Sequence, residues 1–113
     1  MLPKQQMGSP FQSTADNITA SAATASIAGV SGRKHYITDI AAASDLDGAT
    51  VEVRDGSTVI WQYVLGTVAT GQNTIDHTFA TPLWGSSGAS VYVVVDGSAY
   101  DLTKANIAGF TAA

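Results

Sequence analysis

Residues 49–54 alternate apolar and polar side chains and lead through an Asp-Gly pair into the apolar-rich residues 57–65, and this pattern constrains the fold most strongly. In its first half, Val51 and Val53 fall on one face of an extended strand, opposite a polar face. A period of two is typical of a strand with one buried face, and Asp-Gly is a common hairpin turn. Residues 49–65 therefore predict two antiparallel strands that are joined at Asp55 and Gly56.

The length of that turn decides which side chains reach the core. In a loop of two residues, Val53 pairs with Thr58, and the apolar residues of the second strand turn outward. In a loop of three residues, 54–56, Val53 pairs with Ser57 and the same apolar residues turn inward. They are Val59, Trp61 and Tyr63. Because a slip of one residue reverses every side chain, we favour the three-residue loop.

Strand patterns recur along most of the remaining chain, between turns that are rich in Gly and Asp. The segments are 14–30, 33–42, 73–80, 89–95 and 106–111. Segment 14–30 is rich in Ala, Ser and Thr and lacks helical spacing of its apolar residues, so we expect it to be extended. About seven or eight short strands with such turns predict an all-β fold, as a sandwich or a barrel.

Two of these strands have faces that the sequence defines. In 33–42, we expect Tyr36 and Ile40 on one face and Ile37 on the other. In 73–80, three apolar or aromatic residues alternate with polar ones, and they are Ile75, His77 and Phe79. Both patterns predict sheets that turn one face toward a core.

A second hairpin is expected to start at Asp96 and Gly97. A turn of two residues at this point pairs Val93 with Tyr100, and so matches large side chains across the two strands. The last strand, 106–111, is expected to close the sheet.

The N-terminal residues have the composition of an arm rather than of a regular element. Pro3, Gly8 and Pro10 interrupt any repeat, and the stretch has no periodicity. We therefore divide the chain into an extended N-terminal arm over 1–13 and a single β-sandwich domain over 14–113.

Charged side chains are scarce, and this bears on what surrounds the protein. Asp, Glu, Lys and Arg make up 12% of the chain, against roughly a quarter in an ordinary soluble domain. Segments 14–30 and 105–113 contain only Asp16 between them. Because surface charge keeps free monomers apart, we expect neighbouring subunits to cover these two ends of the chain.

Composition also disfavours several classes of function. A net charge of −4 argues against a nucleic-acid partner, which needs a basic face. No apolar run approaches the roughly 20 residues that span a bilayer, so no membrane partner is expected. The first residues lack the apolar core of a secretory signal, which predicts synthesis in the cytoplasm. Without Cys, the chain has no disulfide or thiolate chemistry.

No set of residues in the sequence forms a catalytic or metal-binding motif. His35 and His77 are the two histidines, and no third ligand follows either at metal-ligand spacing. Residues 45–48 (DLDG) resemble the start of a calcium loop but lack its later acidic ligands. We therefore expect no enzyme activity, no cofactor and no metal site.

Trp84 differs from the other aromatic residues, most of which are expected in the core. It lies among small residues in an expected loop over 82–88, where its ring can be exposed. An exposed aromatic side chain is typical of an interface hot spot. A glycan-binding platform is the competing use, and it would combine Trp84 with Tyr63 and Tyr100.

Three stretches resemble a known family of proteins. They are residues 28–38 (AGVSGRKHYIT), 55–61 (DGSTVIW) and 79–85 (FATPLWG). In this order they resemble stretches of the small jelly-roll decoration (cement) or head-fibre proteins of tailed-phage capsids. The resemblance implies a jelly-roll-like antiparallel β-sandwich without catalytic residues. It also implies an oligomer, either a dimer or a trimer, that binds the major capsid protein on the virion.

The predicted function is that of a virion structural protein that stabilises the capsid shell. The expected contacts come from Met7, Phe11, Trp84 and Phe110, with Arg33 and Lys34 as polar anchors. A glycan- or receptor-binding β-sandwich module of a phage tail or fibre is the alternative function.

Overall fold

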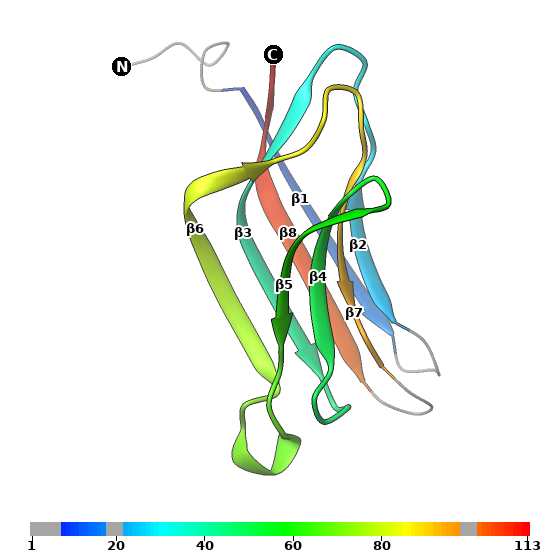
Figure 1. The fold of residues 1–113 in the computed structure, drawn as a ribbon, viewed down its shortest axis with the longest axis vertical. Helices are drawn as coiled ribbons and strands as arrows, with labels where there is room; N and C mark the ends of the chain where they lie inside the picture. Colours follow the sequence, from blue (N-terminus) through cyan, green and yellow to red (C-terminus); the bar gives the residue numbers. More distant parts are fainter. Residues whose placement is uncertain (1–7, 18–21, 98–101) are drawn as a thin grey trace.

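The computed structural model describes residues 8–17, 22–97 and 102–113. These residues form two four-stranded antiparallel sheets that pack face to face (Figure 1). Sheet A has the order β1 (Ser9–Asn17), β8 (Thr103–Ala112), β3 (Lys34–Ser44) and β6 (Thr74–Trp84). Sheet B has the order β2 (Ala23–Ile27), β7 (Val91–Val95), β4 (Thr50–Asp55) and β5 (Thr58–Val64).

This strand order is that of a jelly roll, in which the chain passes repeatedly from one sheet to the other. The predicted all-β, jelly-roll-like antiparallel sandwich is therefore confirmed. A short turn of 3-10 helix, η1 (Val68–Thr70), is the one helical element in the described part of the chain. No helix among those residues is long and apolar enough to cross a membrane.

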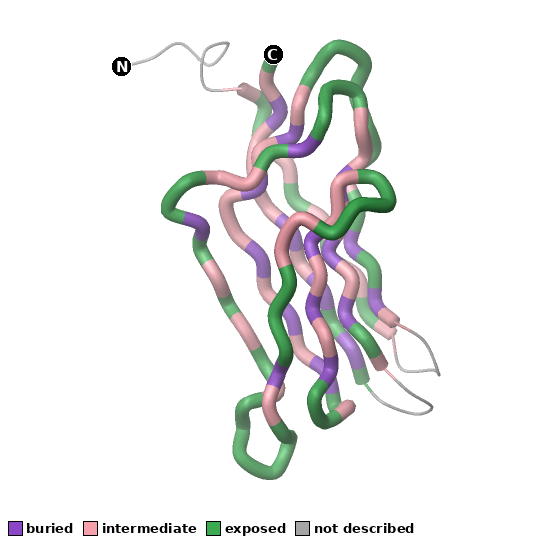
Figure 2. Tube along the Cα trace, in the orientation of Figure 1, coloured by how far each residue is buried: buried purple, intermediate pink, exposed green. Residues whose placement is uncertain are grey.

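The core lies between the two sheets and consists largely of β-branched residues. Alternate residues of β4 and β7 are fully buried, and so are Ile37, Ile40 and Ile107 of sheet A (Figure 2). Val51 and Val53 face inward as predicted. Full burial of one such side chain contributes about 1.5–3 kcal/mol of hydrophobic stabilisation, so the core holds the two sheets together.

A bulge in β3 changes the predicted faces of this strand. The pairing of β3 with β8 shifts between Ile37 and Asp39, so that Thr38 is an extra residue. In the pairing with β6, the same step leaves residues 79–82 of β6 without a partner in β3. A bulge reverses the alternation of side chains beyond it, and Ile37 and Ile40 both point into the core. The prediction that Tyr36 and Ile40 share a face is wrong, because the bulge lies between them.

The turn between β4 and β5 contains two residues rather than three. Asp55 pairs with Thr58, so Gly56 and Ser57 form the loop. Gly56 has a φ of 59°, a left-handed conformation that a tight hairpin turn requires and that glycine adopts without strain. The predicted pairing of Val53 with Ser57 is therefore wrong.

A bulge in β5 nevertheless brings the aromatic side chains to the predicted face. Ile60 is the extra residue, since the pairing of β5 with β4 shifts between Val59 and Trp61. Trp61 and Tyr63 return to the face of the buried β4 valines, as the three-residue loop was expected to achieve. Val59 does not, because it precedes the bulge and is exposed.

The hairpin predicted at Asp96 and Gly97, which pairs Val93 with Tyr100, is wrong. β7 pairs with β2 and β4, whereas β8 pairs with β1 and β3, so the chain crosses between sheets after β7. Val93 pairs with Ala25 on one side and with Val53 on the other, and both sides of its strand are covered. Its predicted partner, Tyr100, lies outside the described residues.

β1 begins before the predicted domain boundary. Residues 9–13 belong to this strand and pair with β8, although the sequence assigned 1–13 to an arm. Pro10 is accommodated because β1 is an edge strand, which needs ladder hydrogen bonds on one side only. Residues 1–7 lie outside the described residues, and so does the predicted contact residue Met7.

The uncharged C-terminal segment forms most of β8, which lies between β1 and β3 in the middle of sheet A. Its inward side chains, such as Ala105 and Ile107, are fully buried. The scarcity of charge in this segment therefore follows from burial within the chain, before any neighbouring subunit is considered.

Candidate binding surface

Four cyclic side chains form a row across the outer face of sheet A. Pro10, Phe110, Tyr36 and Trp84 lie directly opposite one another on β1, β8, β3 and β6. The rings of Phe110 and Tyr36 stack, with centroids 4.9 Å apart and planes 10° apart. Trp84 ends the row and is 58% exposed. We call these four residues the aromatic row, although Pro10 is not aromatic. A partner can bury this row without desolvating a charged group.

Trp84 is exposed, as predicted, but it ends a strand rather than lying in a loop. β6 pairs again with β3 after Pro82, where Leu83 lies opposite Ile37 and Trp84 opposite Tyr36. Pro82 is tolerated because β6 is an edge strand. The sheet therefore fixes the backbone of Trp84, which presents its ring on the outer face.

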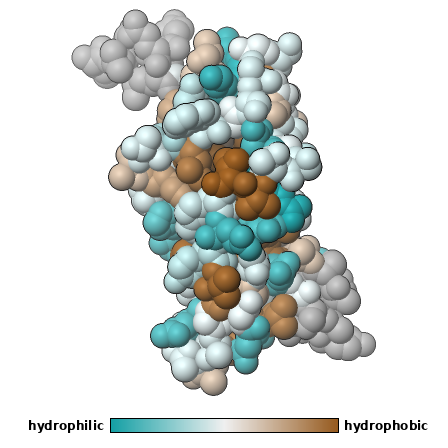
Figure 3. All heavy atoms as spheres, in the orientation of Figure 1, coloured by the Kyte–Doolittle hydropathy of each residue, from teal (hydrophilic) through white to brown (hydrophobic). Residues whose placement is uncertain are grey.

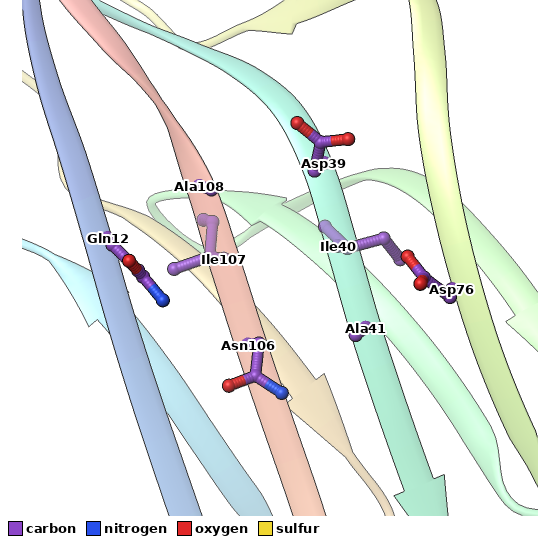
Figure 4. Close-up of a pocket in the computed structure, with 8 residues that line it drawn as sticks. All are labelled: Gln12, Asp39, Ile40, Ala41, Asp76, Asn106, Ile107 and Ala108. Carbon is purple, nitrogen blue, oxygen red and sulfur yellow. The ribbon is translucent and has the colours of Figure 1, made fainter.

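A shallow hollow lies on the same face, beyond the aromatic row. It has a volume of about 80 Å³ and is lined by residues of all four strands of sheet A (Figure 4). Its polar residues are Gln12, Asn106, Asp39 and Asp76. The lining that the hollow exposes is nevertheless mostly apolar, so these polar side chains contribute little of its surface.

Asp39, which lines this hollow, accepts two side-chain hydrogen bonds. The Thr78 hydroxyl donates to Asp39 Oδ1 at 2.6 Å, and the Thr38 hydroxyl donates to Oδ2 at 2.8 Å. These hydrogen bonds hold the pKa of Asp39 below its ordinary value, and the bond from Thr78 contributes most. The carboxylate therefore stays ionised near neutral pH and links β3 to β6.

The two histidines lie in different environments. His35 is buried, with Nε2 2.8 Å from the carbonyl oxygen of Ala28 and Nδ1 2.7 Å from Thr111 Oγ1. Because a carbonyl oxygen only accepts, Nε2 carries a hydrogen and donates it to Ala28. His77 instead stacks on Trp61, with ring centroids 5.4 Å apart. Within the described part of the chain, no three His, Cys, Asp or Glu side chains are grouped to hold a metal ion.

Three of the predicted contact residues share the outer face of sheet A. Phe110 and Trp84 belong to the aromatic row, and Lys34 starts β3 on the same face, two residues before Tyr36. Arg33 is exposed in the turn that precedes this strand. The structure thus brings together residues from both ends of the chain.

Phe11 lies on the opposite face of sheet A from these residues. Its ring meets the ring of His35 edge to face, with centroids 5.4 Å apart, and it packs against the core. Its side chain is therefore engaged inside the sandwich, rather than on the surface where a partner was expected.

An aromatic cluster joins the two sheets between β5 and β6. Trp61 lies 5.4 Å from His77 and from Phe79, and it stacks on Tyr63 at 6.1 Å, all between ring centroids. His77 and Phe79 are themselves 4.7 Å apart. The alternation in each strand placed its two aromatic residues on one face, but it did not reveal that the two pairs meet.

The glycan platform that the sequence suggested is not assembled. Trp84 lies on the outer face of sheet A, whereas Tyr63 belongs to the aromatic cluster on β5 of sheet B. Tyr100 lies outside the described residues. The sequence also missed the hollow on this face, because residues from four strands form it and only their register brings them together.

Comparison with solved structures finds this β-sandwich in a chain of a phage capsid structure. A chain of the acidic stable capsid structure of Helicobacter pylori bacteriophage KHP30 matches with a TM-score of 0.56 and 12% identity. This match covers 92% of our chain and 89% of that chain. At this identity the similarity shows the fold alone.

Two further structures match with lower TM-scores. A β-1,3-glucan-binding CBM6 from Bacillus halodurans has a TM-score of 0.45 and 20% identity, over 92% of our chain and 87% of that chain. The virus-like particle of the extra small virus of Macrobrachium rosenbergii has a TM-score of 0.39 and 14% identity, over 89% and 77%. No protein-family model matches the sequence, and no curated protein matches it either.

Proposed function

We propose that this protein is a decoration (cement) protein of a tailed-phage particle, which binds and stabilises the capsid shell as an oligomer. The observation that carries the proposal is the jelly roll itself, which matches a chain of a phage capsid structure over most of both chains. The stretches at 28–38, 55–61 and 79–85 support it, since they resemble stretches of such proteins. The proposed partner is the major capsid protein, on the virion surface, after synthesis in the host cytoplasm.

The proposed shell-binding surface is the outer face of sheet A. The aromatic row offers large rings to a partner, and Lys34 adds a positive charge beside it. A protein that binds only the assembled shell shifts the equilibrium toward that shell, in proportion to the free energy of binding. Because the protein would act by binding alone, we propose no catalytic activity and no cofactor, nucleic-acid or membrane partner.

Co-sedimentation with capsid shells tests the proposal. The shells come from the virus that encodes this chain and are assembled without this protein. We expect the wild type to sediment with the shells and to raise the temperature at which they open. We expect Trp84→Ala to weaken binding at least about tenfold, because exposed aromatic anchors often contribute about 2 kcal/mol or more. Thr24→Ala, exposed on the outer face of sheet B, is the matched control. A wild type that leaves the shells unbound would contradict the proposal.

A glycan- or receptor-binding module of a phage tail or fibre is the second candidate, and the exposed ring of Trp84 favours it. A sugar can stack on this ring, and Asp76 and Asn106 offer hydrogen bonds to a longer ligand further along the same face. A glycan array with the wild type, Trp84→Ala and Asp76→Asn separates the two functions. A specific hit that both variants lose supports this candidate, whereas shell binding without any hit supports the first.

A further inference from the structure

Exposed apolar side chains concentrate along β5 and the turn that follows it. Val59, Tyr63, Val64 and Val68 are between 41% and 61% exposed, and they make up most of the large exposed apolar residues in the described chain. In Figure 3, hydrophobic residues form separate groups along the face that β5 crosses in Figure 1, with hydrophilic residues between them. An apolar surface of this kind on a soluble protein marks a site of association.

The backbone of β5 is also open along one side. Within sheet B it pairs with β4 alone. The N–H of Leu65 donates to the carbonyl oxygen of Ala49 at 2.8 Å, which fixes the alternation of the ladder between these strands. The backbone N–H and C=O groups of Gln62 and Val64 therefore point away from β4. Such a row is a template for another strand.

β5 differs from the other edge strands in being seven residues long without charge or proline. Its sequence is TVIWQYV. β6 contains Asp76 and Pro82, and β1 contains Pro10 and Asp16. β2 has only five residues. Charge, proline, short length and β-bulges keep edge strands from pairing, and β5 has only the bulge at Ile60, which leaves the regular stretch from Trp61 to Val64 open.

We infer that β5 is covered by the β5 strand of a second copy of this chain. The two strands run antiparallel about a two-fold axis, with Gln62 nearest the axis. An identical strand fits this edge, because in an antiparallel pair about a two-fold axis the N–H groups of each copy face the C=O groups of the other. No charge in β5 opposes its own copy. The inference deepens the oligomeric part of the proposed function and does not depend on capsid binding.

Substitution of Gln62 tests the interface, since this exposed residue can change without loss of the core. Light scattering after size-exclusion chromatography should find a dimer for the wild type. Gln62→Lys places two positive charges across the axis, and we expect it to weaken association more than about tenfold. Gln62→Glu should do the same. Thr24→Lys, exposed on β2, is the matched control and should remain a dimer.

Mixing the two charged variants separates specific pairing from damage to the fold. Gln62→Lys and Gln62→Glu together place opposite charges across the axis, so the mixture should form a heterodimer. Circular dichroism should show that each variant alone is folded. A wild type that is monomeric or trimeric, a Gln62→Lys variant that associates like the wild type, or a mixture of folded variants that stays monomeric would overturn the inference. Shell binding is measured separately, so its failure is not confused with these outcomes.

Discussion

β5 and β6 border the same side of the sandwich, yet their exposed edges differ in chemistry (Figure 1). β6 carries Asp76 and Pro82, which discourage a foreign strand from pairing with it. β5 carries neither charge nor proline, and it exposes Val59, Tyr63 and Val64. The two edges therefore differ in charge, and β5 is the edge that lacks it.

The two strands are also fastened to the molecule by different interactions. β6 is linked to β3 by the hydrogen bond from the Thr78 hydroxyl to the Asp39 carboxylate. β5 meets β6 through aromatic rings, chiefly the ring of Trp61. The stability of this side thus depends on the aromatic contact between β5 and β6, and on the hydrogen bond from Thr78 to the Asp39 carboxylate within sheet A.

Replacement of Trp61 has the largest expected effect on stability, because the ring of this β5 residue contacts His77 and Phe79 of β6. We expect Trp61→Ala to lower the free energy of unfolding by about 3 kcal/mol, since it deletes a large, partly buried side chain. Denaturant unfolding followed by circular dichroism measures this loss. Trp84→Ala, at the exposed end of β6, is the control and should cost less than about 1 kcal/mol. Equal losses would show that the aromatic cluster does not hold the two sheets together.

His77 provides the contact on the β6 side, and its replacement should have a smaller effect. His77→Leu keeps an apolar side chain but loses the ring contacts with Trp61 and Phe79, which are worth about 1 kcal/mol. A double-mutant cycle of His77→Leu with Trp61→Ala should be non-additive, because the two rings are in contact. Strict additivity would mean that the rings are adjacent without being coupled.

Thr78→Val should weaken the charged link on the other side of β6. Loss of its hydroxyl removes the main cause of the low pKa of Asp39, so this pKa should rise toward its ordinary value. A lowered folded pKa adds stability above the unfolded pKa, and that stability is lost as pH falls through the folded pKa. The variant should therefore be less stable than the wild type at neutral pH, with the difference vanishing in acid.

An NMR titration of the Asp39 carboxyl group measures the change. Thr38→Val removes the weaker hydrogen bond and should shift the pKa in the same direction by less. An Asp39 pKa that is the same in Thr78→Val as in the wild type would contradict this assignment.

Asp76→Thr should have the smallest effect on stability. The side chain is exposed on the outer face, so the free energy of unfolding should change by less than about 0.5 kcal/mol. The double variant Asp76→Thr, Pro82→Val leaves β6 without either protective feature and should associate more at high concentration, as seen by light scattering. Unchanged association in the double variant would mean that these residues do not protect the edge.

The strands could be predicted from the sequence because their signals are local. Alternation around Val51 and Val53 identified β4, since one buried face suffices to impose a period of two. The bulges at Thr38 and Ile60 could not be predicted in this way. Each inserts a single residue whose place is set by packing against the opposite sheet, and no local pattern records it.

Local patterns did not predict which strands pair with one another in each sheet. The turn residues Asp96 and Gly97 favour a hairpin, but the neighbouring strand Val91–Val95 finds partners on both sides in sheet B. The aromatic row had the same difficulty, because Phe110 and Trp84 are neighbours only through the registers of β8, β3 and β6. Exposure of Trp84 was predictable, since its surroundings in the sequence are small.

Hydrogen exchange at two protein concentrations tests the difference between the two edges. At a concentration where the protein associates, the amides of Gln62 and Val64 should be protected, because the second copy accepts their hydrogen bonds. On dilution to monomer their protection should fall, while outward amides of β6 should exchange rapidly at both concentrations. Outward amides of β5 that exchange as fast as those of β6 in the associated protein would contradict the claim that β5 is the covered edge.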